Sequence, residues 1–187
     1  MLIVLIVVLV IIAIPLIVAL FVRKSFSVER EITISRPIHI VFNYLKHLKN
    51  QDNYSKWATV DPNMKKEYRG TDGTVGFVSA WESTDKNVGV GEQEIKKITE
   101  GKRIDFELRF IKPFHSVANA YMTMDAMSNN ETIVNWGFDS TMSYPKNLML
   151  LFNMEKMIGD DLTTGLVNLK NQLEKQDAEV WRNENKG

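Results

Sequence analysis

The sequence predicts an α+β protein in which a curved antiparallel sheet of about seven strands wraps on one long C-terminal helix, preceded by a membrane helix. Three observations carry this prediction. Residues 1–22 contain no charged side chain, residues 64–142 alternate apolar and polar positions between turn signals, and residues 148–173 place an apolar side chain at every third or fourth position. At 187 residues, the chain is long enough for one globular domain and too short for two ordinary ones.

The first 22 residues form the predicted membrane helix. At about 1.5 Å rise per residue, a helix of this length reaches about 33 Å, which is enough to cross a hydrocarbon core. A cleavable signal peptide needs a basic segment, a shorter apolar core and a small-x-small cleavage site, and none of these is clear here. Because Arg23 and Lys24 follow the span, the positive-inside rule predicts a single-pass protein whose soluble domain faces the cytoplasm.

Composition narrows the classes of function. The 23 basic and 23 acidic side chains balance, and no long run of one sign appears, so we expect no nucleic-acid partner. The chain has no cysteine, which excludes disulfides, thiolate metal sites and a cysteine nucleophile. The oligomeric state is not determined by the sequence.

The chain divides into four predicted segments. The membrane helix covers residues 1–22, a linker covers 23–27, the folded domain covers 28–175 and a polar tail covers 176–187. Residues 28–34 alternate apolar and polar side chains, which predicts the first, half-buried strand of the domain.

A helix is expected directly after this strand. Ser35 supplies a possible N-cap hydroxyl and Pro37 a proline in the first turn, and the helical apolar stripe that follows ends near Asn50. A short second helix or turn then leads to Trp57.

Six further strands and a final helix complete the predicted domain. Turn signals separate strands expected at residues 65–69, 75–82, 88–98, 103–111, 116–127 and 132–142. From Leu148 to Leu173 the apolar period changes to that of a helix of about 28 residues, and this is the only element long enough to cover the apolar face of the sheet.

Several short motifs, taken with this pattern of elements, resemble those of a known protein family. They are Ile32-Thr33-Ile34-Ser35-Arg36-Pro37 with Val41-Phe42, Trp57, Val88-Gly89-Val90-Gly91, Glu100-Gly101-Lys102-Arg103-Ile104, Asn147-Leu148 and Gly165-Leu166-x-x-Leu169. In this order the chain resembles the helix-grip fold of the SRPBCC superfamily, which includes START lipid-transfer domains, the birch-pollen allergen family and the polyketide cyclase/dehydrase group. The resemblance covers about residues 28–175 and implies a mainly apolar cavity between sheet and helix.

The pair Gly89 and Gly91 raises the question of a phosphate-binding loop. No third glycine follows at the required spacing and no helix begins there, so a dinucleotide fingerprint is rejected. We expect these glycines to mark a bulge or a close approach of another element.

The carboxylates Glu92 and Glu94 raise a second question, because they share one face of a predicted strand. With a two-residue loop at Glu100-Gly101, Ile95 lies opposite Phe106 and the carboxylates face outward. With Gly101 in a left-handed bulge of a longer loop, Glu94 lies opposite Phe106 and faces inward. The first register is favoured because unpaired buried carboxylates are costly, but the second would create a candidate acid/base site.

Other chemistry has weaker support. The histidines are His39, His47 and His115; the first two are eight positions apart, which does not match a helical metal site, and we expect surface histidines and no metal or other cofactor. No serine has a recognisable nucleophile elbow, and catalytic residues are not identified.

Aromatic and methionine side chains are the most informative candidates for a site, because the resemblance implies a cavity that such side chains would line. The predicted cavity residues are Trp57, Phe77, Trp81, Gln93, Phe106, Phe110, Met122, Trp136, Phe138, Met142, Leu151 and Met154.

The leading hypothesis is a membrane-anchored domain that binds a lipid or another hydrophobic small molecule in an internal cavity. The alternatives are an enzyme similar to polyketide cyclases and dehydrases, and a tethered interaction module without a ligand.

Overall fold

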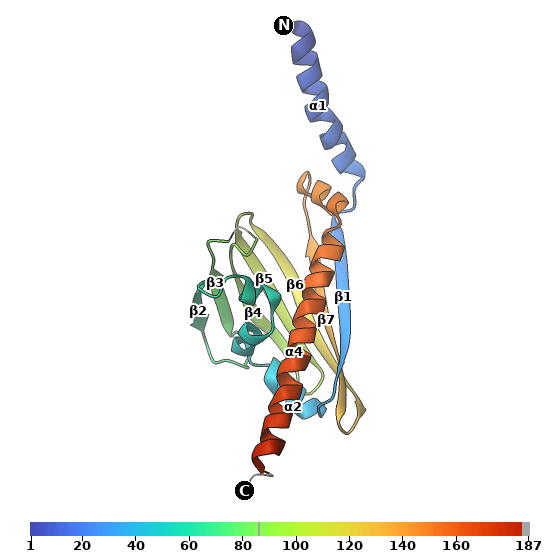
Figure 1. Cartoon of the computed structure of the whole chain (residues 1–187). Helices are drawn as coiled ribbons and strands as arrows, with labels where there is room; N and C mark the ends of the chain where they lie inside the picture. Colours follow the sequence, from blue (N-terminus) through green and yellow to red (C-terminus); the bar gives the residue numbers. More distant parts are fainter. Residues whose placement is uncertain (86, 185–187) are drawn as a thin grey trace.

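The chain folds as an antiparallel sheet gripping a long helix, with a separate apolar helix at the N-terminus (Figure 1). A computed structural model describes residues 1–85 and 87–184, with side chains described as far as residue 175. The apolar helix α1 (Leu2–Phe21) stands clear of the domain, and α4 (Met154–Glu184) runs across one face of the sheet. The predicted α+β helix-grip architecture is confirmed.

The sheet has seven strands in the order β1-β7-β6-β5-β4-β3-β2, all antiparallel to their neighbours. Their bounds are β1 Ser25–Ile34, β2 Lys65–Arg69, β3 Val78–Glu82, β4 Val90–Thr99, β5 Arg103–Lys112, β6 Ser116–Ser128 and β7 Glu131–Thr141. The strand β1 starts before the predicted residue 28, because Ser25 already pairs with Thr141 of β7. The predicted linker therefore shortens to Arg23 and Lys24.

The helical segment after β1 differs from its prediction. Instead of one helix to Asn50, the chain forms α2 (Ile38–Leu45), the 3-10 helix η1 (Leu48–Asn53) and α3 (Lys56–Val60). The break occurs where the backbone N–H of Leu48 donates to Asp72 Oδ1 at 2.8 Å, outside any helical pattern.

Ser35 is also not the N-cap. That position belongs to Pro37, and the backbone N–H of Ser35 donates to Glu174 Oε1 on α4. The bond at 2.8 Å ties the end of β1 to the long helix.

The C-terminal helix starts later and ends later than predicted. Residues Lys146–Phe152 form a 3-10 helix, η2, and Asn153 adopts a left-handed backbone (φ 53°) before α4 begins. Leu151 consequently lies outside α4, and its side chain is exposed rather than packed on the sheet. The helix continues through Glu184, beyond the predicted end near residue 176, and residues 185–187 lie outside the described part of the chain.

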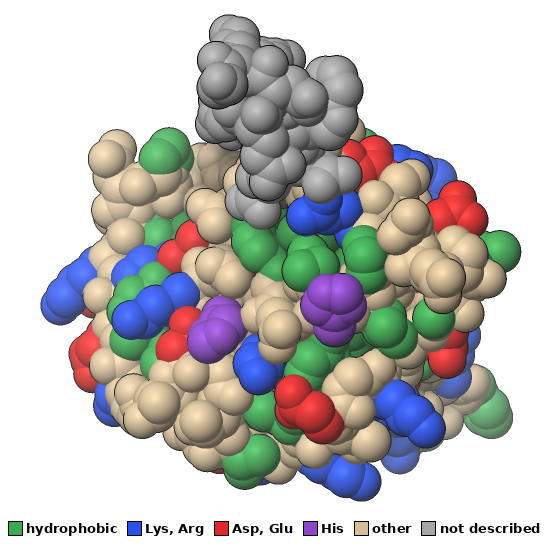
Figure 2. All heavy atoms as spheres, turned by 90° about the horizontal axis from the view of Figure 1, so that it is seen from below, with side chains coloured by type: hydrophobic (Ala, Val, Ile, Leu, Met, Phe, Trp, Pro, Cys, Tyr) green, Lys and Arg blue, Asp and Glu red, His purple; other side chains and the backbone are tan. Residues whose placement is uncertain are grey.

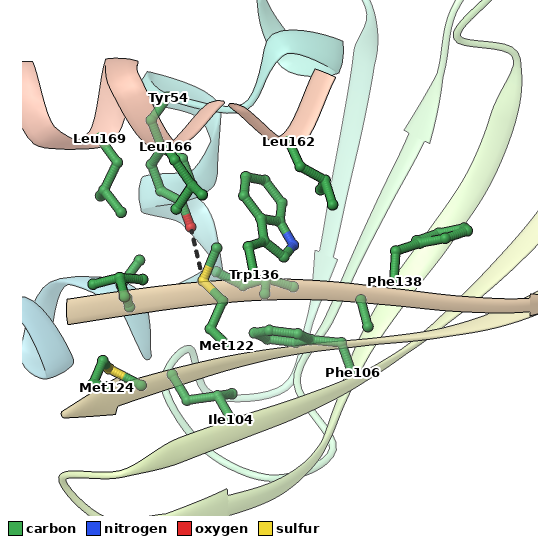
Figure 3. Packing of buried hydrophobic residues seen from close by; sticks show 14 of the residues in the cluster. Tyr54, Ile104, Phe106, Met122, Met124, Trp136, Phe138, Leu162, Leu166 and Leu169 are labelled. Carbon is green, nitrogen blue, oxygen red and sulfur yellow. Dashed lines mark hydrogen bonds between the residues drawn. The ribbon is translucent and has the colours of Figure 1, made fainter. Parts of the chain in front are cut away.

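The core lies between α4 and the concave face of the sheet (Figure 3). Leu162, Leu166 and Leu169 project from α4 toward Met122 and Trp136 of the sheet, and all five are buried. Helix and indole approach closely at Gly165, where a Cβ atom would lie 2.7 Å from Cζ3 of Trp136. The absent side chain thus lets α4 rest directly on the aromatic ring.

The joint between α1 and the domain is a defined contact. The Asn147 side chain of η2 is buried, and its Nδ2 donates to the carbonyl oxygens of Ala19 at 2.7 Å and Val22 at 2.9 Å. Ala19 lies in the last turn of α1 and Val22 directly follows the helix, where backbone C=O groups lack intrahelical partners. The amide of Asn147 therefore caps the helix and holds η2 against it.

The glycines of the Val88–Gly91 motif serve backbone packing, as predicted. Gly89 has φ 65°, and a Cβ there would overlap the carbonyl of Lys112. At Gly91 a Cβ would lie 2.6 Å from Cζ2 of Trp81 and 2.8 Å from the Arg109 carbonyl oxygen, beside a register shift of the β4–β5 ladder. The Trp81 indole therefore lies directly over the β4 backbone.

Substituting Gly91→Ala tests this close approach. We expect the variant to lose about 1–3 kcal/mol of unfolding free energy, because the added methyl group forces the indole or the strand to move. Chemical denaturation followed by tryptophan fluorescence measures the loss. Gly101→Asn is the matched control, because no atom lies within 4 Å of that Cβ position and asparagine tolerates its φ of 70°; equal stability of the two variants would contradict the packing role.

Candidate functional site

A cavity of about 290 Å³ lies between the concave face of the sheet and the first turns of α4. Its volume is near the lower limit of small-molecule sites, about 300 Å³. The lining side chains come from η1, α3, the loop after α3, β2 to β7, the β3–β4 turn and α4. The cavity is thus enclosed by the elements that define the grip rather than by one loop.

Paired aromatic rings form part of its apolar wall. Trp81 and Phe110 meet edge to face with centroids 6.2 Å apart, and Trp57 meets Trp136 in the same way at 6.3 Å. The indole N–H of Trp81 donates to the Val88 carbonyl at 3.3 Å, which fixes that ring at the β3–β4 turn. Such edge-to-face pairs hold the rings in defined orientations.

Two polar side chains face each other on this wall. Ser79 of β3 pairs with Gln93 of β4, and the two residues are only 7% and 6% exposed. Among the residues that the structure describes, neither side chain has a hydrogen-bond partner. Their polar atoms do not count among the buried unpaired atoms of the domain, so they are open to the cavity, where a polar atom of a bound molecule would be within reach.

An ion pair with a bound tyrosine hydroxyl lies at another part of the cavity lining. Lys66 Nζ donates to Asp52 Oδ1 at 2.7 Å, and the Tyr68 hydroxyl donates to Asp52 Oδ2 at 2.7 Å. Burial, and then the bond to Asp52, raise the pKa of Tyr68, so its hydroxyl remains protonated and can act as a donor. Asp52 and Lys66 both line the cavity.

Seven of the twelve predicted cavity residues line this space: Trp57, Trp81, Gln93, Phe110, Trp136, Phe138 and Met154. Whether they bind a ligand stays a prediction.

The other five lie elsewhere. Phe106 and Met122 are in the closed core under Leu166, and Phe77 stacks on Tyr68 at 6.1 Å. Met142 packs at the edge of the core and Leu151 is exposed on η2. Strand alternation identifies the inward face but not the point along that face where the helix stops touching the sheet.

Sequence reasoning missed several cavity residues in short segments and, apart from Met154, those on α4. These are chiefly Asp52, Ser55, Lys66, Ser79, Met157 and Ile158. The helical period would have placed Ile158 on the inner face, whereas Asp52 and Lys66 carry no periodic signal.

The open register of the β4–β5 hairpin is resolved. The loop has three residues, with Lys102 N–H donating to the Thr99 carbonyl and Gly101 left-handed, unlike the favoured two-residue loop. A register shift between Ile95 and Lys97 then restores the favoured pairing, so Ile95 lies opposite Phe106. Gln93 and Ile95 are buried, which confirms the predicted inward face.

Glu92 and Glu94 therefore lie on the outer face, away from the cavity. Arg109 binds both, with Nε 2.7 Å from Glu92 Oε1 and Nη1 2.7 Å from Glu94 Oε2. Hydrogen bonds from Arg69 and then Arg109 lower the pKa of Glu92, and bonds from Arg109 and then Lys96 lower that of Glu94. The pair is an ionised surface network, so the acid/base role tied to the second register does not apply.

The histidines do not gather into a site. His39 and His115 are exposed, as predicted, and His47 contacts Asp72 with Nδ1 3.5 Å from Oδ2. Within the described residues, no group of three or more metal-ligating side chains converges.

Comparison with protein families places this cavity in context. Residues 25–174 match a family described as polyketide cyclase / dehydrase and lipid transport. Comparison with curated proteins finds no match. The N-terminal helix α1, with a mean hydropathy of 3.6 and little of it buried, is long and apolar enough to cross a membrane.

Solved structures share the fold at low sequence identity. A Nitrosospira multiformis protein is 15% identical with a TM-score of 0.56, covering 79% of this chain and 96% of its own. A norcoclaurine synthase point mutant from Thalictrum flavum, in complex with a transition-state analogue, is 7% identical with a TM-score of 0.61, covering 82% and 96%. Ara h 8.0201 is 11% identical with a TM-score of 0.53, covering 81% and 99%.

The outer carboxylates predict a specific dependence of stability on pH. The pKa values of Glu92 and Glu94 in the folded protein lie below the ordinary value of 4.5, so their contribution is complete above about that pH and is lost as the pH falls. We expect the Glu92→Gln/Glu94→Gln variant to show a shallower decline of unfolding free energy between about pH 5 and pH 3 than the unmodified chain. Urea denaturation across that range measures both slopes, and parallel slopes would contradict the network.

Proposed function

This chain belongs to the polyketide cyclase / dehydrase and lipid transport family, and from that premise we propose that it is a membrane-anchored protein that binds a small amphiphile in the cavity under α4. The observation that carries the proposal is the pair Ser79 and Gln93, which has no hydrogen-bond partner among the described residues and lies in a mainly apolar wall. Their polar atoms are accessible from the cavity, so a bound molecule with a carbonyl or hydroxyl could pair with both.

The volume and lining of the cavity also limit the size and charge of the ligand. The cavity volume of about 290 Å³ suits a compact molecule with a hydrocarbon body and an uncharged polar group. Apolar burial would provide most of the affinity, at about 0.8 kcal/mol for each buried CH₂ group. An uncharged head group fits best because Lys66 is already neutralised by Asp52.

The proposed anchor is α1. Its 20 residues reach about 30 Å as a helix, which matches a hydrocarbon core. With Arg23 and Lys24 at its end, we propose that the domain faces the cytoplasm. A tethered domain takes up ligands that partition into the adjoining bilayer, instead of carrying them through water.

A second candidate is an enzyme of the cyclase or dehydrase type. The group formed by Asp52, Lys66 and Tyr68 favours it, because a carboxylate, an ammonium and a phenol beside an apolar cavity can move protons between bound carbon and oxygen atoms. A tethered interaction module without a ligand fits less well, because its cavity would be collapsed.

Native mass spectrometry of the full chain, purified from its host membrane, separates these candidates. Recovery of a small molecule that is unchanged after prolonged incubation supports binding. Conversion of that molecule, lost in Lys66→Met, supports the enzyme. Recovery of no molecule, together with no binding to a panel of neutral lipids and aromatic amphiphiles, would defeat both.

Filling the cavity should abolish binding. Ala120 of β6 lines the cavity, so Ala120→Phe places a ring in the ligand's space. We expect at least a tenfold weaker affinity for N-phenyl-1-naphthylamine, a neutral apolar fluorophore, measured by energy transfer from the tryptophans of the wall. Ala126→Phe, on the exposed end of the same strand, is the control and should bind normally; equal affinity of both variants would place the probe elsewhere.

Removing the Gln93 amide should change the stability of the protein and its binding of ligand in opposite directions. In Gln93→Leu we expect the ligand-free protein to gain roughly 1 kcal/mol of stability, because an amide without a protein hydrogen-bond partner is replaced by an apolar side chain. Retention of the co-purified ligand in native mass spectra should fall. Gln172→Leu on α4, outside the cavity, should change neither quantity, and a loss of stability in Gln93→Leu would instead mean that the amide supports the fold.

A further inference from the structure

Exposed apolar side chains gather at the end of the domain next to α1. Because β1 begins beside α1 and the sheet is antiparallel, the β5–β6 turn and the end of β7 lie at that same end (Figure 1). Phe114 in the turn is 58% exposed, and on η2 Leu151 and Phe152 are 58% and 80% exposed. Together with Tyr144 and Met149, these residues are called the rim here.

The opposite end of the domain differs. Figure 2 views that end, where hydrophobic side chains are interrupted by acidic, basic and histidine side chains. The large hydrophobic residues Val75 and Met127, in the β2–β3 loop and near the β6–β7 turn, are each 60% exposed there. Water-exposed protein surfaces commonly carry such isolated residues, whereas a cluster indicates an interaction site.

The position of the rim is fixed by the joint with α1. Asn147, within η2, binds the carbonyl oxygens of Ala19 and Val22 at the end of α1. Since the 20 residues of α1 have about the length of a hydrocarbon core, those carbonyls lie at the depth of the head groups. The exposed residues Leu151 and Phe152 therefore cannot be far from the bilayer surface.

Charge around the rim fits an anionic lipid surface. Lys24, Lys112 and Lys146 are exposed at this end, and Lys146 Nζ lies 5.8 Å from the ring centroid of Phe114. Arg23 is held by Glu155, with Nη1 3.0 Å from Oε1. Exposed aromatic rings beside lysine are typical of segments that rest in a membrane interface.

Part of the cavity lining lies beside the rim. Met154 and Met157 line the cavity and follow η2 within the first turn of α4, and Val88 lines it from the β3–β4 turn at the same end of the sheet. Met157 is also exposed, so it borders both the cavity and the outer surface.

We propose that the rim enters the interface of the bilayer that α1 spans, so that the cavity exchanges its ligand directly with the adjoining leaflet. The exchange rests on the proposed function, whereas insertion of the rim rests only on α1 spanning the membrane. A ligand moving between leaflet and cavity would then avoid water.

Single-cysteine labelling tests insertion, because the chain has no cysteine of its own. The full chain is reconstituted into bilayers of phosphatidylcholine and phosphatidylglycerol, labelled at Phe114→Cys or Phe152→Cys with an environment-sensitive fluorophore. Val75→Cys and Met127→Cys are matched controls, since they are exposed apolar residues at the far end. Lipids carrying a quencher near the head group should quench the rim labels several-fold more than the controls.

Equal quenching at all four positions would overturn the proposal. A blue-shifted but unquenched label at Phe152, with dimers detected by cross-linking, would also overturn it, in favour of contact with a second copy of the chain.

Exchange is tested separately with the double variant Leu151→Ser/Phe152→Ser. Vesicles containing N-phenyl-1-naphthylamine are mixed with bilayers containing the protein, and energy transfer from the cavity tryptophans reports loading. We expect loading at least several-fold slower in the variant with the same final amplitude, whereas an unchanged rate would overturn direct exchange. If the unmodified chain takes up no fluorophore, both the proposed ligand binding and the ligand exchange are contradicted. The quenching experiment would still decide whether the rim enters the bilayer.

Discussion

The packing of α4 on the inner face of the sheet is the interaction on which the rest of the structure depends. Near the middle of the helix, Leu166 and Leu169 meet Met122 and Trp136, and the contact is closed. Gly165 allows it, because any side chain there would strike the indole of Trp136. Toward its first turn the helix no longer fills the concave face, and the space between Trp136, Phe110 and Met154 remains as the cavity.

The same packing explains why polar residues can remain unpaired inside the domain. Ser79 and Gln93 line the part of the concave face where the cavity separates the sheet from α4. A collapsed core would reject two such groups, since their desolvation would be uncompensated. Their presence is the reason for proposing that a polar atom of a bound molecule occupies the cavity.

The start of α4 also sets the relation between the domain and α1. Because Asn153 ends η2 in a left-handed conformation, Leu151 and Phe152 are exposed instead of continuing the buried stripe, whereas Leu150 stays in the core. Asn147 then ties η2 to the last carbonyls of α1. One break in helical structure thus exposes Phe152 and places it beside the proposed membrane span.

The sequence by itself determined the order of the elements, because periods of two and of three to four residues are local properties that the backbone of a strand or helix imposes. It also determined that Gly89 and Gly91 serve packing, and it favoured the face on which Gln93 lies. Only the tertiary structure decided how the β4–β5 hairpin reaches that face, since the left-handed Gly101 and the shift before Lys97 cancel in register. The extent of the cavity was likewise decided by the tertiary structure. Phe106 and Phe110 share a strand face, yet only Phe110 lines the cavity. The distance between helix and sheet is set by long-range packing and not by either segment alone.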